Sequence, residues 1–252
     1  NKPIGIKSLE INQSPFITNP YRFGIAEESV RGVFAGGSRI GDVNTIDYLD
    51  IATLGNATDF GDLTVARRAV DGVSSDVRGV FGGGQSGTYF NVMDYITIAT
   101  TANATDFGDL TVARRNVGAV SSDVRGVFGG GYNTTYSNVM DYITIATTGN
   151  ALDFGDLTVD AGATACVNSD VRGVISTASG SNGMDYITIA TTGNALDFGD
   201  LTAVSNGGMA GVSSTTRGLF GGGYNASNVS QSYIDYIAIA TTGNALDFGD
   251  LS

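Results

Sequence analysis

Residues 125–172 read R-G-V-F-G-G-G-Y-N-T-T-Y-S-N-V-M-D-Y-I-T-I-A-T-T-G-N-A-L-D-F-G-D-L-T-V-D-A-G-A-T-A-C-V-N-S-D-V-R, and the chain repeats this pattern five times. Each copy opens with an Arg-Gly pair, at Arg31, Arg78, Arg125, Arg172 and Arg217. Successive copies are therefore 47, 47, 47 and 45 residues apart. A fixed period in the forties, built from short apolar runs, is typical of repeat architectures. The pattern predicts one domain made of five tandem units.

Each unit has the composition of four short strands. In the third copy we expect them at residues 116–121, 125–128, 139–146 and 154–159. β-Branched and aromatic residues fill these runs, Gly, Ser, Thr and Asn separate them, and no helical spacing is present. Four strands in a unit of about 45 residues form the blade of a β-propeller. The sequence thus predicts an all-β, five-bladed propeller with four antiparallel strands per blade over residues 23–252.

Residues 1–22 do not follow the repeat and contain all three prolines of the chain. Ile4, Ile6, Leu9 and Ile11 have the spacing of one short edge strand. We interpret this segment as an N-terminal extension or docking arm.

The composition disfavours several classes of function. Hydrophobic residues make up 42% of the 252 residues and charged residues 15%, which predicts a folded chain. A net charge of −12 without a basic run argues against nucleic-acid binding, and the absence of a long apolar stretch argues against membrane insertion. The chain has no histidine and one cysteine, so it lacks the usual general base and the commonest zinc or copper ligand. We expect a non-enzymatic protein without cofactors, with Cys166 as a small core residue.

The motifs also resemble a known family. Gly129-Gly130 and Tyr142 resemble the double glycine and the tyrosine of the Kelch repeat, and Phe154 stands where that family usually has tryptophan. The phrases V-R-G-V-F-G-G-G and N-A-T-D-F-G-D-L-T are similar to repeats in predicted virion proteins of phages that infect marine bacteria. The resemblance implies a structural or adhesion protein of the virion, such as a tail-fibre, tail or capsid-surface component.

In that case residues 1–22 would contact other virion proteins, and the propeller would bind a host surface glycan or receptor. The alternative is a cellular or secreted Kelch-type interaction scaffold. An enzyme resembling galactose oxidase is a third class, but its copper site would require histidine ligands that the sequence does not contain.

The candidate binding site lies in the loops between the second and third strands. These loops differ between copies, at residues 38–42, 85–90, 132–136, 179–182 and 224–228, whereas the T-T-G-N-A-x-D-F-G-D segments expected on the opposite face are nearly constant. Variation confined to one face of a rigid scaffold indicates a binding surface, although unconstrained drift would look the same. Aromatic rings stack on sugars, and amides bond their hydroxyls. The predicted ligand-binding residues are Tyr89, Phe90, Tyr132, Asn133, Tyr136, Tyr224 and Asn225.

The charged residues allow further interpretations. Arg67, Arg68, Arg114 and Arg115 would bind an acidic ligand near this face or, as we favour, balance local charge. The Arg-Gly arginines are predicted to bridge the aspartates of the D-Y motif, Asp47, Asp94, Asp141, Asp185 and Asp235. The paired aspartates of D-x-G-D would either bind calcium or, as we favour, close turns through their side chains. Acid catalysis by such a pair is disfavoured because all five copies are equivalent.

Overall fold

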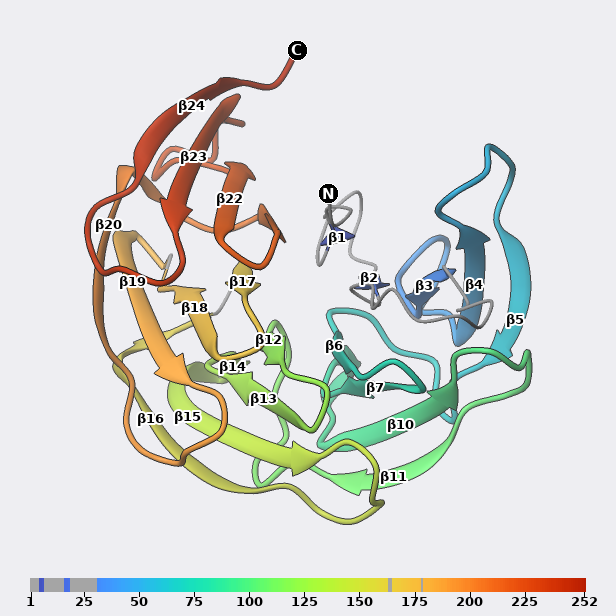
Figure 1. The fold of residues 1–252 in the computed structure, drawn as a ribbon. Coiled ribbons are helices and arrows are strands. Elements are labelled where there is room, and N and C mark those ends of the chain that lie inside the picture. The colour runs from blue at the N-terminus through green and yellow to red at the C-terminus, as the bar shows by residue number, and fades with distance from the viewer. Residues whose placement is uncertain (1–4, 7–15, 19–30, 163–164, 178) are drawn as a thin grey trace.

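A computed structural model describes residues 5–6, 16–18, 31–162, 165–177 and 179–252. These residues form five antiparallel sheets arranged around a common centre as a five-bladed β-propeller (Figure 1). The predicted fold is confirmed. The described part of the chain contains no helix of the length and apolarity needed to cross a membrane.

Every blade has four strands, ordered from the centre outward. Blade 1 comprises β2 (Phe16–Thr18), β3 (Arg31–Ala35), β4 (Thr45–Asp50) and β5 (Thr58–Asp62), and blade 2 comprises β6 (Asp71–Ser74), β7 (Arg78–Gly82), β10 (Val92–Thr97) and β11 (Thr105–Asp109). Blade 3 comprises β12 (Gly118–Ser121), β13 (Arg125–Gly129), β15 (Thr135–Thr144) and β16 (Leu152–Ala161). Blade 4 comprises β17 (Cys166–Asn168), β18 (Arg172–Ser176), β19 (Ser181–Thr188) and β20 (Leu196–Ser205). Blade 5 comprises β21 (Met209–Ser213), β22 (Arg217–Gly222), β23 (Tyr233–Ala238) and β24 (Leu246–Asp250).

Two short strands come from the N-terminal segment. β2 pairs with β3 and supplies the innermost strand of blade 1, and β1 (Gly5–Ile6) pairs with β21 at the inner edge of blade 5. Of the four residues proposed for an edge strand, Ile6 lies in β1, and Ile4, Leu9 and Ile11 lie outside the described residues. A docking role for residues 1–22 stays a prediction.

The D-F-G-D motif lies in a bulged outer strand, which overlaps the fourth strand expected in each copy. The expected contact of its first aspartate with nearby backbone occurs in blade 5, where Gly249 N–H donates to the Asp247 side chain at 3.1 Å. In blade 2 the pairing of β10 with β11 shifts register between Met93 and Asp94, opposite Gly108. Gly108 has a φ of +137°, a conformation that L side chains rarely adopt. A Cβ there would lie 2.5 Å from the backbone of Gly149 in the next blade. Glycine is therefore required both by the bulge and by the close approach of the neighbouring loop.

That neighbouring loop forms a clamp between blades. Gly149 N–H donates to the Phe107 carbonyl at 2.7 Å, and Ala151 N–H donates to the Asp109 carbonyl at 2.8 Å. The Asn150 side chain accepts from Asp109 N–H at 3.1 Å. The same Asn-Ala loop of blades 2, 4 and 5 holds the outer strand of the preceding blade in the same way. The constant part of the repeat thus encodes the contact between consecutive units.

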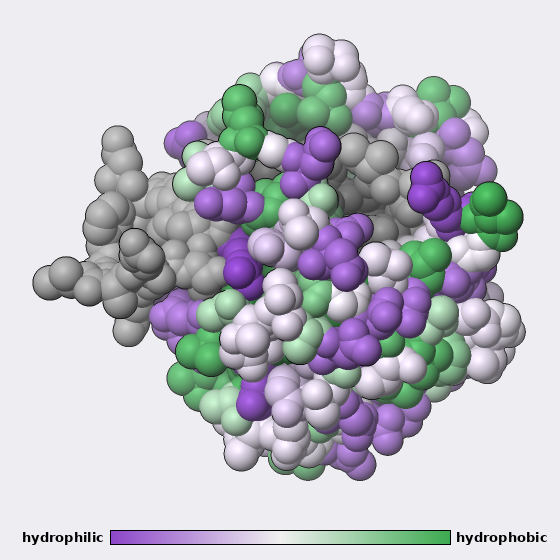
Figure 2. Space-filling view, turned by 90° about the vertical axis from the view of Figure 1, so that its right-hand side faces the viewer, coloured by the Kyte–Doolittle hydropathy of each residue, from purple (hydrophilic) through white to green (hydrophobic). Residues whose placement is uncertain are grey.

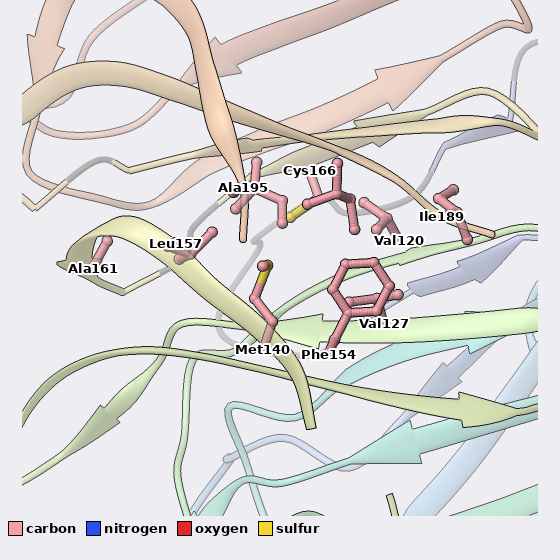
Figure 3. Close-up of a cluster of buried hydrophobic side chains, with 11 residues drawn as sticks. Val120, Val127, Met140, Phe154, Leu157, Ala161, Cys166, Ile189 and Ala195 are labelled. Carbon is pink, nitrogen blue, oxygen red and sulfur yellow. The ribbon is translucent and has the colours of Figure 1, made fainter. Parts of the chain in front are cut away.

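The hydrophobic core lies between blades in four separate clusters. In the cluster between blades 3 and 4, Val127, Met140 and Phe154 point toward Cys166 and Ala195 of the next blade (Figure 3). Cys166 is buried in this cluster, as expected. Because each cluster takes residues from two consecutive blades, no blade completes its core alone.

The predicted bridge between Arg-Gly arginines and D-Y aspartates is wrong. The Arg125 guanidinium lies 4.4 Å from the centre of the Tyr142 ring, and that ring meets Phe154 edge-on at 6.1 Å. Arg125 also donates to the carbonyls of Ile189 and Ala190 in the next blade, at 3.2 and 2.7 Å. Equivalent arginine and tyrosine pairs occur in all five blades. The tyrosine ring, and not the aspartate, is therefore the partner of each Arg-Gly arginine. The face of an aromatic ring attracts a guanidinium, so no carboxylate is needed at this position.

Candidate functional site: the variable face

The variable loops and the links between blades lie on the same face, as predicted. We call this the variable face, comprising residues 38–42, 85–90, 132–136, 179–182 and 224–228. Arg68 in the link from blade 1 to blade 2 pairs through its backbone with Gln85, and Arg115 in the next link pairs with Tyr132. The Arg115 N–H donates to the Tyr132 carbonyl at 3.1 Å, and the Tyr132 N–H donates back at 2.8 Å. The loops are therefore fixed to the blades by main-chain hydrogen bonds.

Three of the predicted residues form a tyrosine cluster, which consists of Tyr89, Tyr132 and Tyr136. Tyr132 meets Tyr89 at a ring-centre distance of 6.0 Å and Tyr136 at 5.5 Å, both edge-on. The Arg115 guanidinium lies 5.0 Å from the centre of the Tyr132 ring. Tyr136 is 47% exposed, whereas Tyr89 and Tyr132 are half-buried. The cluster joins the loops of blades 2 and 3 and leaves one ring available to a ligand.

A polar network continues from the tyrosine cluster toward blade 1. With its amide oriented to accept, the Gln85 oxygen lies 2.9 Å from Nη2 of Arg68 and 3.2 Å from Nη1 of Arg115. Arg68 pairs with Asp42 at 2.5 Å. Burial raises the pKa of Asp42, but hydrogen bonds from Ser86, Arg68 and Ser38 and the charge of Arg68 outweigh it and hold the pKa below its ordinary value. The loops of blades 1, 2 and 3 are thus connected by side chains.

The remaining predicted residues have other positions. Phe90 is half-buried, and its carbonyl accepts from Arg114 N–H at 3.0 Å. Asn133 is half-buried in the tight β14–β15 connection, where β14 comprises Tyr132–Asn133 and Thr134 has a φ of +58°. Phe90 and Asn133 therefore belong to the same region as the tyrosine cluster.

Tyr224 and Asn225 lie on blade 5. Tyr224 is 46% exposed, and the Asn225 side-chain oxygen accepts from the N–H groups of Ser227 and Val229 at 2.9 and 3.0 Å. Asn225 thus holds its own loop. The seven predicted residues fall into two groups, and their role in ligand binding stays a prediction.

The adjacent arginines separate into two environments, which the sequence analysis did not distinguish. Arg68 and Arg115 belong to the variable face, whereas Arg67 and Arg114 are fully buried. Arg67 pairs with Asp94 and Arg114 with Asp141, each at 2.7 Å with both side chains 0% exposed. Consecutive residues of an extended segment point to opposite sides, and this alternation is the signal that would have separated each Arg-Arg pair.

Blades 4 and 5 keep the aspartate but lose the buried arginine. Ala161 and Ser205 occupy the positions of Arg114 in the later copies. Asp185 is 2% exposed and accepts hydrogen bonds from Thr158 N–H at 2.8 Å and from its hydroxyl at 2.7 Å. Burial raises the pKa of Asp185, opposed by these Thr158 hydrogen bonds. The ion pairs therefore belong to two junctions of this repeat and not to the fold in general.

No metal centre is evident in the described ranges, where no group of three or more His, Cys, Asp or Glu residues gathers. Calcium binding by the D-x-G-D strands stays untested. A small pocket of about 170 Å³ lies outside the variable face, between Phe107 and the 147–152 loop. Its lining comes from the constant part of the repeat, so it offers no feature specific to one blade.

Comparison with protein-family models and with curated proteins gives no match for this chain.

Proposed function

We propose that this propeller is a non-enzymatic structural or adhesion protein of a phage virion, with a Kelch-like repeat, and that it binds a carbohydrate or a protein through the variable face. The observation that carries the proposal is the tyrosine cluster with Arg115 above it. Rings presented edge-on to one another on main-chain-anchored loops lose little conformational freedom when a ligand stacks on them. The Arg115 guanidinium adds donors at the same place.

The fold alone does not select this function, because propellers serve many activities. Support comes from the position of the cluster on the one face where the repeats differ. The cluster also has a defined orientation, since Gln85, Arg68 and Asp42 connect it to blade 1. A glycan would place a sugar ring on the exposed Tyr136 and its hydroxyls near Arg115 and Asn133.

The test is a glycan array probed with the full chain, followed by titration of any glycan found. We expect Tyr136→Ala to weaken binding at least tenfold. Leu196→Ala is the control, because Leu196 is comparably exposed but lies in β20 outside the variable face, and it should leave binding unchanged. An antibody against the protein should detect it in purified phage virions. If no glycan or protein is bound and no particle contains the chain, the proposal is refuted.

A further inference from the structure

Four junctions between consecutive blades share one set of contacts. A threonine of the preceding blade bonds the D-Y aspartate of the following one, in the pairs Thr64–Asp94, Thr111–Asp141, Thr158–Asp185 and Thr202–Asp235, at 2.5 to 2.7 Å. The Asn-Ala clamp closes on the outer strand of the preceding blade, and an apolar cluster fills the space between the two. We call this set the repeat junction.

The face of blade 5 that follows β24 makes no such junction with the described residues. Phe248 is 51% exposed, whereas its counterparts Phe60, Phe107, Phe154 and Phe198 are each 2% exposed. Leu251 is 51% exposed, and its counterparts in blades 1 to 4 are at most 3% exposed. A Cβ at Gly249 would meet nothing within 4 Å, although Gly108 meets the clamp there. This face has the chemistry of a junction without its partner.

Blade 1 presents the complementary half. Ile51 is 41% exposed, while Ile98, Ile145, Ile189 and Ile239 are 0–1% exposed at the same position. Ala57 of the clamp loop is exposed, and Asp47 is half-buried where Asp94 is fully buried. In Figure 1 the blades form an open arc, with β24 at one end and the β4–β5 pair at the other. Apolar groups on the side of blade 1 are scattered among polar ones (Figure 2), so the unfilled positions are recognised by comparison with the repeat.

We propose that this open junction binds one further unit of the same repeat, which completes the ring. The occupant must satisfy both faces. Toward β24 it must present an Asn-Ala clamp and a D-Y aspartate, and toward blade 1 it must present a D-F-G-D-L-T strand. One four-stranded unit of this repeat carries all of these, and residues 1–22 carry none of them.

Other occupants fit less well. A second copy of the chain offers only its two end blades, and each of them already has one face packed on its own neighbour. It can therefore fill one half of the junction but not both. Direct closure of blade 5 on blade 1 would need the arc to contract across the opening, which would distort four junctions that are already satisfied. A single inserted unit contacts blade 5 with one side and blade 1 with the other, so it accounts for both exposed faces and closes the ring.

The experiment uses the full chain and, as probe, a separate polypeptide of residues 112–158, which begins and ends in phase with the repeat. Calorimetry and light scattering should show saturable one-to-one binding. Phe248→Ser and Ile51→Ser should each weaken that binding at least tenfold, because both side chains are exposed where their counterparts are buried in a repeat junction. Ile40→Ser is the control, since Ile40 is fully exposed on the variable face, and it should leave the affinity unchanged.

A second arm covers the case in which the isolated unit does not stay soluble. Residues 112–158 are appended after Ser252, which continues the repeat in register. We expect a single cooperative unfolding transition at a higher Tm than that of the 252-residue chain. An appended unit that unfolds separately, together with no binding in the first arm, overturns the proposal. A defined dimer that Phe248→Ser dissociates would overturn it in favour of a second copy. A disulfide that forms within the monomer of Phe248→Cys/Ala57→Cys would overturn it in favour of direct closure.

Discussion

The buried ion pair between blades 2 and 3 allows a prediction with an internal control. Arg114 and Asp141 are both fully buried, and their shortest contact is 2.7 Å. Asp141→Asn removes the negative charge and leaves the Arg114 cation buried among neutral acceptors only, which are the Val139 and Phe128 carbonyls and the new amide oxygen. Breaking a buried pair from one side costs about 3–5 kcal/mol. In a chain of this length a loss of 1 kcal/mol lowers Tm by roughly 2–4 °C, so we expect a fall of about 6–20 °C.

Asp185→Asn is the matched control. Asp185 accepts from Thr158 in the same way that Asp141 accepts from Thr111, but no arginine faces it, because Ala161 stands at the position of Arg114. The same substitution here removes a charge that burial disfavours and strands no cation. We expect the free energy of unfolding at pH 7 to be unchanged or higher.

Urea denaturation of both variants, followed by tyrosine fluorescence and circular dichroism, measures the difference. The double variant Arg114→Met/Asp141→Asn should recover much of the loss, since it removes the stranded charge while keeping the apolar stem. Equal destabilisation by Asp141→Asn and Asp185→Asn would refute the reasoning. The loss would then come from the threonine and aspartate hydrogen bonds common to all four junctions, and not from the buried cation.

Three further outcomes are expected. The folded-state pKa of Asp185 lies above its ordinary value of 3.8. Between these two pKa values the folded state binds more protons than the unfolded state, so the free energy of unfolding should fall as pH rises from about 3.8 through the folded pKa. Asp185→Asn should remove this slope in denaturation measured as a function of pH. Arg125→Ala should lower the free energy of unfolding in urea by about 1–3 kcal/mol, because it removes the contact with the Tyr142 ring and the hydrogen bonds to two carbonyls. Arg217→Ala removes the contact with the Tyr236 ring, and it should lower the free energy of unfolding by less than half as much. Gly108→Ala should lower Tm far more than Gly249→Ala, because both have positive φ but only Gly108 faces the backbone of a neighbouring blade; equal shifts would contradict the clamp.

The sequence predicts the blades well because their signals are local. The Arg-Gly period, the glycine runs and the tyrosine-bearing strand place the predicted third-copy strands within a few residues of β12, β13, β15 and β16. Tyr89, Tyr132 and Tyr136 could be chosen from loop variation alone, since the strand order already puts their loops on one face.

Pairings between blades could not be predicted in the same way. The Arg-Gly arginine and the D-Y aspartate each occur once per unit, so periodicity cannot say whether they meet. The structure pairs Asp141 with Arg114 from the preceding link and places Arg125 over Tyr142. Likewise, Gly108 reads as a turn residue until the loop that approaches it, 41 residues later along the chain at Gly149, is seen beside it.

The Asn-Ala clamp gives the propeller a direction. Each outer strand is secured by the unit that comes after it in the chain, as Asn150 secures Asp109. During synthesis on the ribosome, the outer strand of each unit gains its clamp hydrogen bonds only after the next unit has emerged, so the most recently made unit lacks them. Consecutive units are therefore fastened in chain order, and hydrogen exchange should be fastest in β24, the outer strand that no clamp contacts among the described residues.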